Sequence, residues 1–187
     1  MPAGGLDASF GRFAGLVPGA RARLEQRSVR YEAMAVALLA DRHLAAPDAV
    51  PPAALAGGTV YAGAGTPRTL EWADLARHLF EGRGIGVAPP APVAVGAEGF
   101  RRVPARTRTP VLTVVDFSAM TETALKPLIG PVPPPPLSLV WRKGLVHPGV
   151  DALRRAAVEL AGEEGWLRQP ADGWIPATGA LIMMSHS

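Results

Sequence analysis

Short apolar runs and helix-period patterns alternate along this chain. Buried strands are predicted where a run is short, apolar and bounded by turn-forming residues: 33–39, 111–115 and 137–141. The run 111–115 has the highest β-branched content, which favours a strand most clearly. A shorter strand is predicted at Thr59–Tyr61, which the glycine-containing segment 63–65 ends.

An amphipathic helix is predicted after this short strand. Its apolar positions follow the i, i+3, i+4, i+7 spacing of one helix face: Trp72, Leu75, Ala76 and Leu79. Thr69 can cap the N-terminus of this helix, and Gly82 stands just past its end, where a left-handed residue is common.

Two more helices and one stiff connector complete the predicted elements. A helix is predicted from about Val150 to Gly162 or Gly165, with this apolar face: Val150, Leu153, Ala157 and Leu160. A short helix is predicted at 98–103, where Pro104 ends it. The proline-rich segment 131–136 predicts an extended connector. Alternation of strands and helices predicts an α/β fold with an at least partly parallel sheet.

Composition supports a packed core and excludes several classes of protein. Hydrophobic residues make up 48% of the 187 residues, and the mean hydropathy is +0.16, which excludes a disordered or collagen-like chain. The absence of cysteine excludes disulfide scaffolds, thiol nucleophiles and cysteine zinc sites. The longest apolar run is 33–40 and no export signal is visible, so we expect a cytoplasmic protein without membrane contact.

An anion-binding loop is predicted at the start of the first helix. The segment 63–66 follows a strand and precedes a helix, but it lacks the glycine spacing of dinucleotide or nucleotide triphosphate loops. Thr66, Arg68 and Thr69 stand at a helix N-terminus, where unpaired N–H groups and the helix dipole favour an anion. The alternative is that Thr69 only caps the helix.

No pattern in the sequence indicates catalysis or metal binding. Glu71, Asp74 and His78 share a helix face, but a solvated polar face explains them better than a metal site. No G-x-S-x-G elbow is present, so we expect a protein that is not an enzyme and has no cofactor.

Nucleic-acid binding also has little support. The net charge of +3 is small, and the arginines gather in two clusters: Arg101, Arg102, Arg106 and Arg108, then Arg21, Arg23, Arg27 and Arg30. Each cluster is interpreted as a solvated face, because no pair of short helices joined by a tight turn accompanies it.

Several strings resemble, in order, the effector-binding half of LysR-type transcriptional regulators. The segment 5–12 (GLDASFGR) resembles the G-x-L-D-x-A-[IF] strand end of that family. Further strings match in the same order: 28–39, 41–45, 50–57 and 137–142. Three departures stand out, since Arg42-His43 replaces His-Pro, the segment 50–57 lacks its Asp, and paired glycines are missing before 111.

The resemblance implies a two-lobed fold of the type-2 periplasmic-binding-protein-like class, with a small ligand held in a cleft. Residues 1–35 and 124–187 are expected to form the first lobe, and residues 36–123 the second. The family's winged helix-turn-helix and the first strand and helix of its first lobe have no counterpart before Gly5. We therefore expect a first lobe that is incomplete at its N-terminal side and no direct contact with nucleic acid.

The resemblance also points to candidate effector-binding residues. The family places polar groups of a strand-to-helix loop in the cleft, a place held here by these four residues: Thr66, Pro67, Arg68 and Thr69. Arg12, Arg30 and Glu32 match positions near the crossover between lobes, and a structural ion pair is the alternative interpretation. Guanidinium groups would favour a carboxylate effector.

The function implied is an effector-sensing domain of a LysR-type regulator. Its expected partners are a small molecule, for which a carboxylate is the favoured class, and further copies of the chain in a homo-oligomer or a full-length homologue. Its expected mechanism is ligand-linked lobe closure that biases an oligomer between two arrangements. The alternative is a non-binding remnant that acts only by associating with intact regulators.

Overall fold

The strands of the protein belong to two separate sheets. The computed structural model describes residues 6–62, 70–89, 99, 102–118, 122–130, 132 and 135–168. The chain divides into two units, which we call unit 1 (Met1–Glu32 with Pro134–Ser187) and unit 2 (Ala33–Pro133). Each sheet lies within one unit.

The boundaries of the two units differ from those expected for the two lobes, which were 1–35 with 124–187 and 36–123. The strand β3 (Met34–Leu39) pairs with β6 (Val111–Val114) and β7 (Thr123–Pro127), so all three strands belong to unit 2. The chain therefore re-enters unit 1 only after residue 133, because β7 contributes its backbone hydrogen bonds to the sheet of unit 2.

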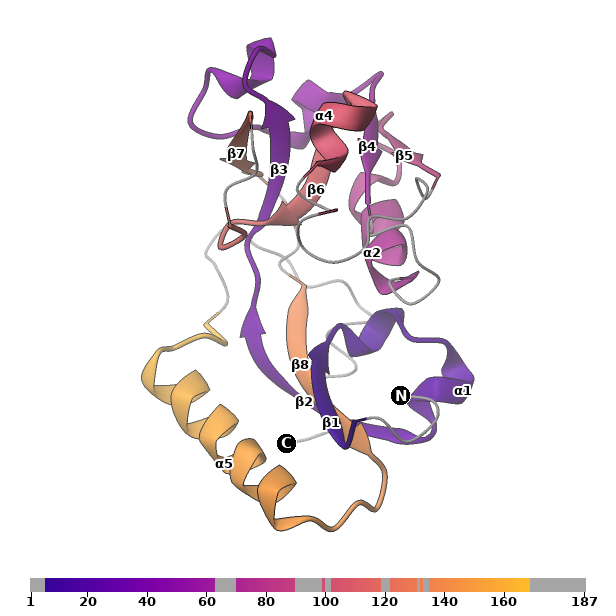
Figure 1. Cartoon of the computed structure of the whole chain (residues 1–187), viewed down its shortest axis with the longest axis vertical. Helices are drawn as coiled ribbons and strands as arrows, with labels where there is room; N and C mark the ends of the chain where they lie inside the picture. The colour runs from indigo at the N-terminus through magenta and orange to yellow at the C-terminus, as the bar shows by residue number, and fades with distance from the viewer. Residues whose placement is uncertain are drawn as a thin grey trace. The chain divides into compact units, whose positions relative to one another are not determined.

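Unit 1 contains a three-stranded antiparallel sheet with one long helix. Its strands have the order β1 (Ala8–Gly11), β8 (Pro136–Arg142), β2 (Leu24–Tyr31), and α5 (Pro148–Glu163) packs on β2 and β8 (Figure 1). Two short helices, η1 (Phe13–Gly15) and α1 (Pro18–Arg21), connect β1 to β2. The core between sheet and helix consists of one buried cluster: Val29, Leu139, Trp141, Val150, Ala157 and Ala161.

Unit 2 contains a five-stranded mixed sheet in the order β5-β4-β6-β3-β7. The strand β4 (Thr59–Tyr61) runs parallel to β5 (Gly86–Ala88) and β6, whereas β3 runs antiparallel to β6 and β7. The prediction of a partly parallel sheet is therefore confirmed. Within the described residues, unit 2 also contains these helices: η2 (His43–Ala45), η3 (Pro52–Leu55), α2 (Leu70–Phe80) and α4 (Val103–Thr107).

Most predicted elements are confirmed, and the correction concerns the apolar face of α5. The short helix predicted at 98–103 lies largely outside the described residues, of which Gly99 is helical, and a further helix, α4, has Pro104 in its first turn. Proline is tolerated there because the first N–H groups of a helix have no intrahelical partner. In α5 the side chains of Leu153 and Leu160 are exposed, although the spacing predicts that they face the core.

No helix in the described ranges is long and apolar enough to cross a lipid bilayer.

Replacing two glycines by alanine, one at the end of α2 and one in α1, tests the predicted end of α2. Gly82 has φ of +69°, as its position after α2 predicts, and Gly82→Ala is expected to lower the free energy of unfolding by about 1 kcal/mol. Gly19 lies in α1, and an added Cβ meets nothing within 4 Å at either glycine. Gly19→Ala is therefore the matched control, and it should be neutral or stabilising by up to about 1 kcal/mol in urea unfolding. Equal destabilisation of both variants would contradict this interpretation.

Candidate functional site

Three charged side chains meet at one end of the sheet of unit 1. We call Arg12, Glu32 and Arg30 the arginine–glutamate cluster. Both β1 and β2 run antiparallel to β8, and their last residues pair near its start, Gly11 with Ser138 and Tyr31 with Pro136. Residues 12 and 32 follow these strand ends directly, so the sheet register brings together side chains that are 20 residues apart.

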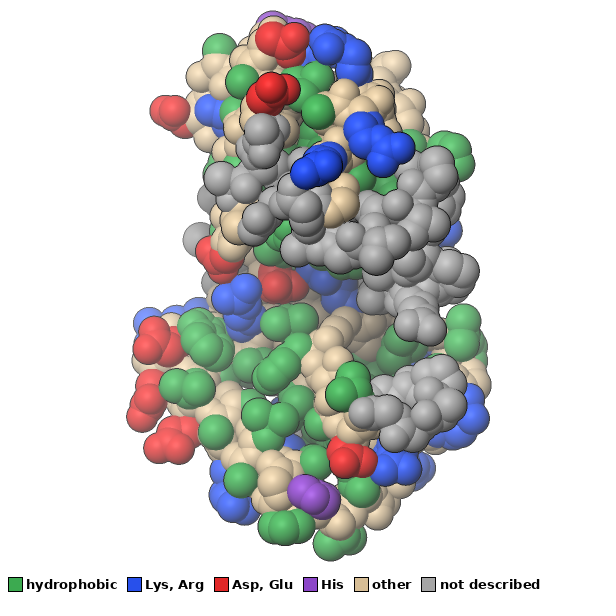
Figure 2. All heavy atoms as spheres, viewed as in Figure 1, with side chains coloured by type: hydrophobic (Ala, Val, Ile, Leu, Met, Phe, Trp, Pro, Cys, Tyr) green, Lys and Arg blue, Asp and Glu red, His purple; other side chains and the backbone are tan. Residues whose placement is uncertain are grey.

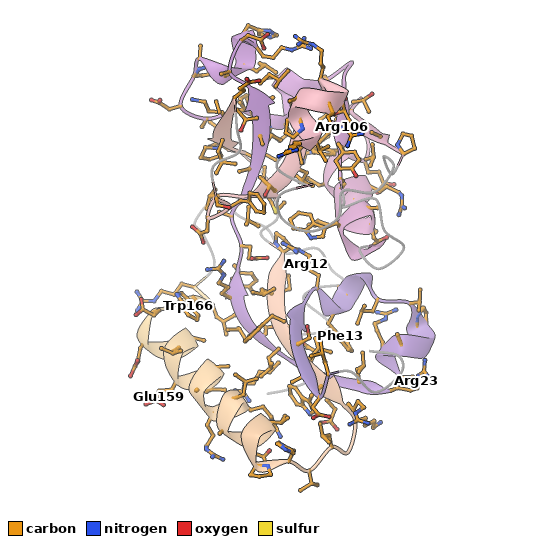
Figure 3. All side chains as sticks on the ribbon, in the orientation of Figure 1. Arg12, Phe13, Arg23, Arg106, Glu159 and Trp166 are labelled. Carbon is orange, nitrogen blue, oxygen red and sulfur yellow. The ribbon has the colours of Figure 1, made fainter. Side chains whose placement is uncertain are left out.

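The cluster is held by ion pairs and by the backbone. Arg12 Nη2 donates to Glu32 Oε2 at 2.5 Å, and Arg30 Nη2 donates to Glu32 Oε1 at 3.3 Å. The backbone N–H of Glu32 donates to the carbonyl of Pro135 at 3.1 Å, which positions the carboxylate beside the start of β8. Figure 3 shows Arg12 beside the same end of β8.

Burial and charge distinguish the two arginines. The side chains of Arg12 and Glu32 are 9% and 8% exposed, whereas that of Arg30 is 30% exposed. Two guanidinium groups face the Glu32 carboxylate, and the Arg12–Glu32 pair lies in a region of reduced solvation, where its attraction is stronger than in water. The Arg30 side chain is partly exposed, and a guanidinium with its planar N–H groups can bind a carboxylate. The arrangement can therefore accept an anion.

Tyr31, the last residue of β2, lies between Arg30 and Glu32 in the sequence. Burial raises the pKa of Tyr31 above its usual value of 10.0. Its backbone N–H donates to the carbonyl of Trp166 at 3.0 Å, which fastens the end of β2 to the segment after α5. The phenol therefore stays neutral at physiological pH and adds no negative charge beside the cluster.

The predicted loop residues Thr66, Pro67, Arg68 and Thr69 lie outside the described residues, so they stay a prediction. The helix that they precede, α2, is present with Ala76 and Leu79 buried on the predicted face. On its polar face Asp74 lies 3.6 Å from Arg77 Nη1 and 3.6 Å from His78 Nδ1. In the described ranges, no three His, Asp or Glu side chains lie close enough to hold a metal ion.

A second polar group in unit 1 was missed by the sequence analysis. Trp141 Nε1 donates to Glu25 Oε2 at 2.8 Å, and the Arg154 guanidinium lies 4.5 Å above the Trp141 ring. These side chains, together with Phe13 and Lys143, line a cavity of about 490 Å³. Glu25 is 116 residues from Trp141, so only the β2–β8 register, which pairs the two residues directly, reveals the contact.

Comparison with known proteins shows that this chain is similar in structure to several solved proteins. No family model matches the chain, and no curated protein matches its sequence. Full-length BenM matches with a TM-score of 0.58 and 17% identity, over 89% of this chain and 54% of that one. The BenM effector binding domain with benzoate matches with a TM-score of 0.63 and 17% identity, over 91% of this chain and 76% of that one. The QuiR effector binding domain with shikimate matches with a TM-score of 0.64 and 12% identity, over 86% of this chain and 74% of that one.

These neighbours are LysR-type regulators and their effector-binding domains, which have the type-2 periplasmic-binding-protein-like fold. The two sheets and mixed α/β architecture of this chain match that fold, so the predicted fold class is confirmed. At identities of 12–17% the likeness concerns the fold. The chain spans about half the length of full-length BenM, 54% of it.

Proposed function

We propose that this chain is an effector-sensing domain of a LysR-type transcriptional regulator that binds a small carboxylate. The observation that carries the proposal is the arginine–glutamate cluster on the matching fold. The second arginine, Arg30, has a side chain that is 30% exposed, so the cluster presents a guanidinium that a carboxylate can reach from solvent.

The ligand class follows from the chemistry of the guanidinium group. A guanidinium presents two parallel N–H groups to a carboxylate, which gives a strong and geometrically specific pair of hydrogen bonds. Two neighbours in fold were solved with carboxylates, BenM with benzoate and QuiR with shikimate. A compact carboxylate of similar kind is therefore the proposed effector here.

Titration calorimetry tests whether Arg30 binds the effector. The full chain is titrated with a panel of small carboxylates that includes benzoate and shikimate. Arg30→Ala is expected to weaken binding about tenfold or more, since it removes a charge-assisted hydrogen bond. Arg27→Ala is the control, because Arg27 lies three residues away on β2 and is exposed. Equal affinities of the two variants, or no binding by the unchanged chain, would refute the proposal.

The loop before α2 is proposed to contribute to effector binding as well. Arg68 precedes the 11-residue helix α2 by two positions, where a helix N-terminus favours an anion. Arg68→Ala is measured against Arg77→Ala, which removes an exposed arginine of α2. Loss of affinity in the first variant alone would support a contribution of residues 66–69 to effector binding.

The proposed mechanism couples effector binding to a shift between two arrangements of a regulator oligomer. Such a shift needs only a difference in effector affinity between the arrangements. The chain then acts as a sensor and not as an enzyme, without contacting DNA itself, in the cytoplasm where transcription takes place. Retained association with an intact regulator without any response to ligand would favour the alternative of a non-binding remnant.

A further inference from the structure

Unit 2 contains a cavity of its own, at the end of the sheet where β3 ends. Its volume is about 470 Å³, and it lies between the segments that follow β3, precede β4 and follow α4. Its inner wall includes side chains from the core of unit 2: Leu38, Leu55 and Val60, which are 2%, 5% and 1% exposed. A cavity of this size with an apolar wall can hold the hydrocarbon part of a small molecule.

The exposed side chains that line this cavity include two arginines and a histidine. Arg42 and His43 follow β3, and Arg108 stands at the C-terminal end of α4. No acidic side chain is among the described residues that line it, whereas Glu25 lines the cavity beside Trp141 in unit 1. Positive charge around an apolar cavity favours a ligand that combines a negative group with an apolar body.

The segments that carry the two arginines are joined by hydrogen bonds. Arg42 Nη2 donates to the backbone carbonyl of Arg108 at 3.3 Å, and Arg108 Nη2 donates to Asp41 Oδ2 at 3.2 Å. Figure 2 shows basic, acidic and histidine side chains together at this end of unit 2. Arg42 forms no ion pair with any residue that the structure describes. A guanidinium has five N–H groups, so both arginines can donate to a bound anion as well.

The backbone conformation of Arg108 is a further indication, independent of charge. Arg108 has φ of 53° and ψ of 25°, which lies in the left-handed region and is unfavourable for a residue with a side chain. Its N–H donates to the carbonyl of Pro104 at 2.8 Å, so an arginine ends the helix where glycine is usual. Residues in such conformations are concentrated at binding sites.

We propose that this cavity binds a small anion with an apolar body, and we call it the Arg42–Arg108 site. The two guanidinium groups hold the anionic group, and the inner wall contacts the apolar body. A carboxylate and a phosphate monoester both accept paired hydrogen bonds from a guanidinium, so the ligand carries one of these two groups. The site contains no residue of the arginine–glutamate cluster, and it therefore does not depend on the function proposed for that cluster.

Titration calorimetry of the full chain with four probes tests the class of ligand. Phenyl phosphate and phenylacetate carry an anionic group on an apolar body, whereas inorganic phosphate lacks the body and benzyl alcohol lacks the charge. The titrations are repeated with Arg30→Ala, which weakens binding at the arginine–glutamate cluster and should leave the Arg42–Arg108 site unchanged. We expect at least one of the phenyl anions to bind with a dissociation constant of about 0.1–1 mM.

The comparison among the probes decides between the outcomes. Tighter binding of phenyl phosphate or of phenylacetate identifies the anionic group that the site prefers. Inorganic phosphate and benzyl alcohol should each bind about tenfold more weakly than the preferred probe, because each lacks one half of the contacts. No saturable binding of either phenyl anion would overturn the proposal, and so would equal affinity for inorganic phosphate or for benzyl alcohol.

Substitution of the two arginines tests where the anion binds. Arg42→Gln and Arg108→Gln should each weaken binding of the preferred probe about tenfold or more, because each removes charge-assisted hydrogen bonds. Arg106→Gln is the matched control, since Arg106 is an exposed arginine of α4 that does not line the cavity (Figure 3). Circular dichroism verifies that every variant is folded. Unchanged affinity in both Arg42→Gln and Arg108→Gln would overturn the proposal.

Asp41→Asn should have the opposite effect on binding. It removes the carboxylate that competes with the ligand for the Arg108 guanidinium and keeps the size of the side chain. We expect the affinity for the preferred probe to rise about twofold or more, because the net positive charge at the site increases. Weaker binding in this variant would contradict the proposal.

The imidazole signals of His43 in nuclear magnetic resonance spectra locate the ligand independently. The chain has four histidines, and His43→Gln identifies the signals that belong to residue 43. The preferred probe should shift these signals and leave those of His147, which belongs to unit 1, in place. A shift at His147 without one at His43 would overturn the proposal.

Discussion

Replacing Glu32 by glutamine is expected to lower the free energy of unfolding by about 3–5 kcal/mol. The substitution keeps the size of the side chain but removes its charge. Arg12 is only 9% exposed, so its guanidinium would stay buried while it loses the charge of the Glu32 carboxylate. Removing one member of a buried ion pair costs far more than the pair itself contributes, because the desolvation of the other charge is no longer compensated by its counter-charge.

Urea unfolding followed by circular dichroism measures this cost. The control is Asp41→Asn, which breaks the pair between Asp41 and Arg108, with side chains 64% and 61% exposed. Exposed pairs contribute about 0–1 kcal/mol, so the control should unfold almost as the unchanged chain does. Similar unfolding free energies for Glu32→Gln and the unchanged chain would show that Arg12 is not held by this carboxylate.

The second large effect is expected from Leu38→Ala, in the centre of unit 2. Leu38 is 2% exposed and lies in β3, whose six residues are all buried between β6 and β7. Removing the three outer carbon atoms of its side chain leaves a cavity that the surrounding strands cannot close. We therefore expect a loss of about 2–5 kcal/mol in the free energy of unfolding.

The same truncation of leucine to alanine at an exposed position shows how much of the loss at Leu38 comes from the buried cavity. Leu6 is 63% exposed in unit 1, and Leu6→Ala should change the free energy of unfolding by less than about 0.5 kcal/mol. Both variants are compared by thermal melting and urea unfolding. A small effect at Leu38 would mean that the sheet of unit 2 relaxes around the missing side chain.

Local patterns in the sequence predicted most elements correctly. The apolar runs became β3, β6 and β8, because a short continuous apolar segment is stable only when both faces of the strand are buried. The helix α2 followed from its apolar spacing, and Gly82 from the need for a left-handed residue after it. These features depend on near neighbours in the chain, so the sequence contains the information directly.

Errors arose where distant packing decides between local possibilities. The spacing of Leu153 and Leu160 fits a helix face, yet α5 turns Ala157 and Ala161 to the sheet of unit 1. Several helix faces of α5 contain apolar residues, and only the shape of the sheet selects among them. The expected boundary at 123/124 differed from the structure for a similar reason, because β7 pairs with a strand more than 80 residues earlier in the chain.

The candidate site combines both kinds of information. Sequence resemblance alone singled out Arg12, Arg30 and Glu32, and their spacing placed Arg30 and Glu32 on the same side of a strand. Only the tertiary structure decided that Arg12 and Glu32 form a buried pair and that Arg30 stays partly exposed. Side-chain periodicity is a property of the local backbone, whereas burial and ion pairing depend on the register of β1 and β2 against β8, which joins segments far apart in the chain.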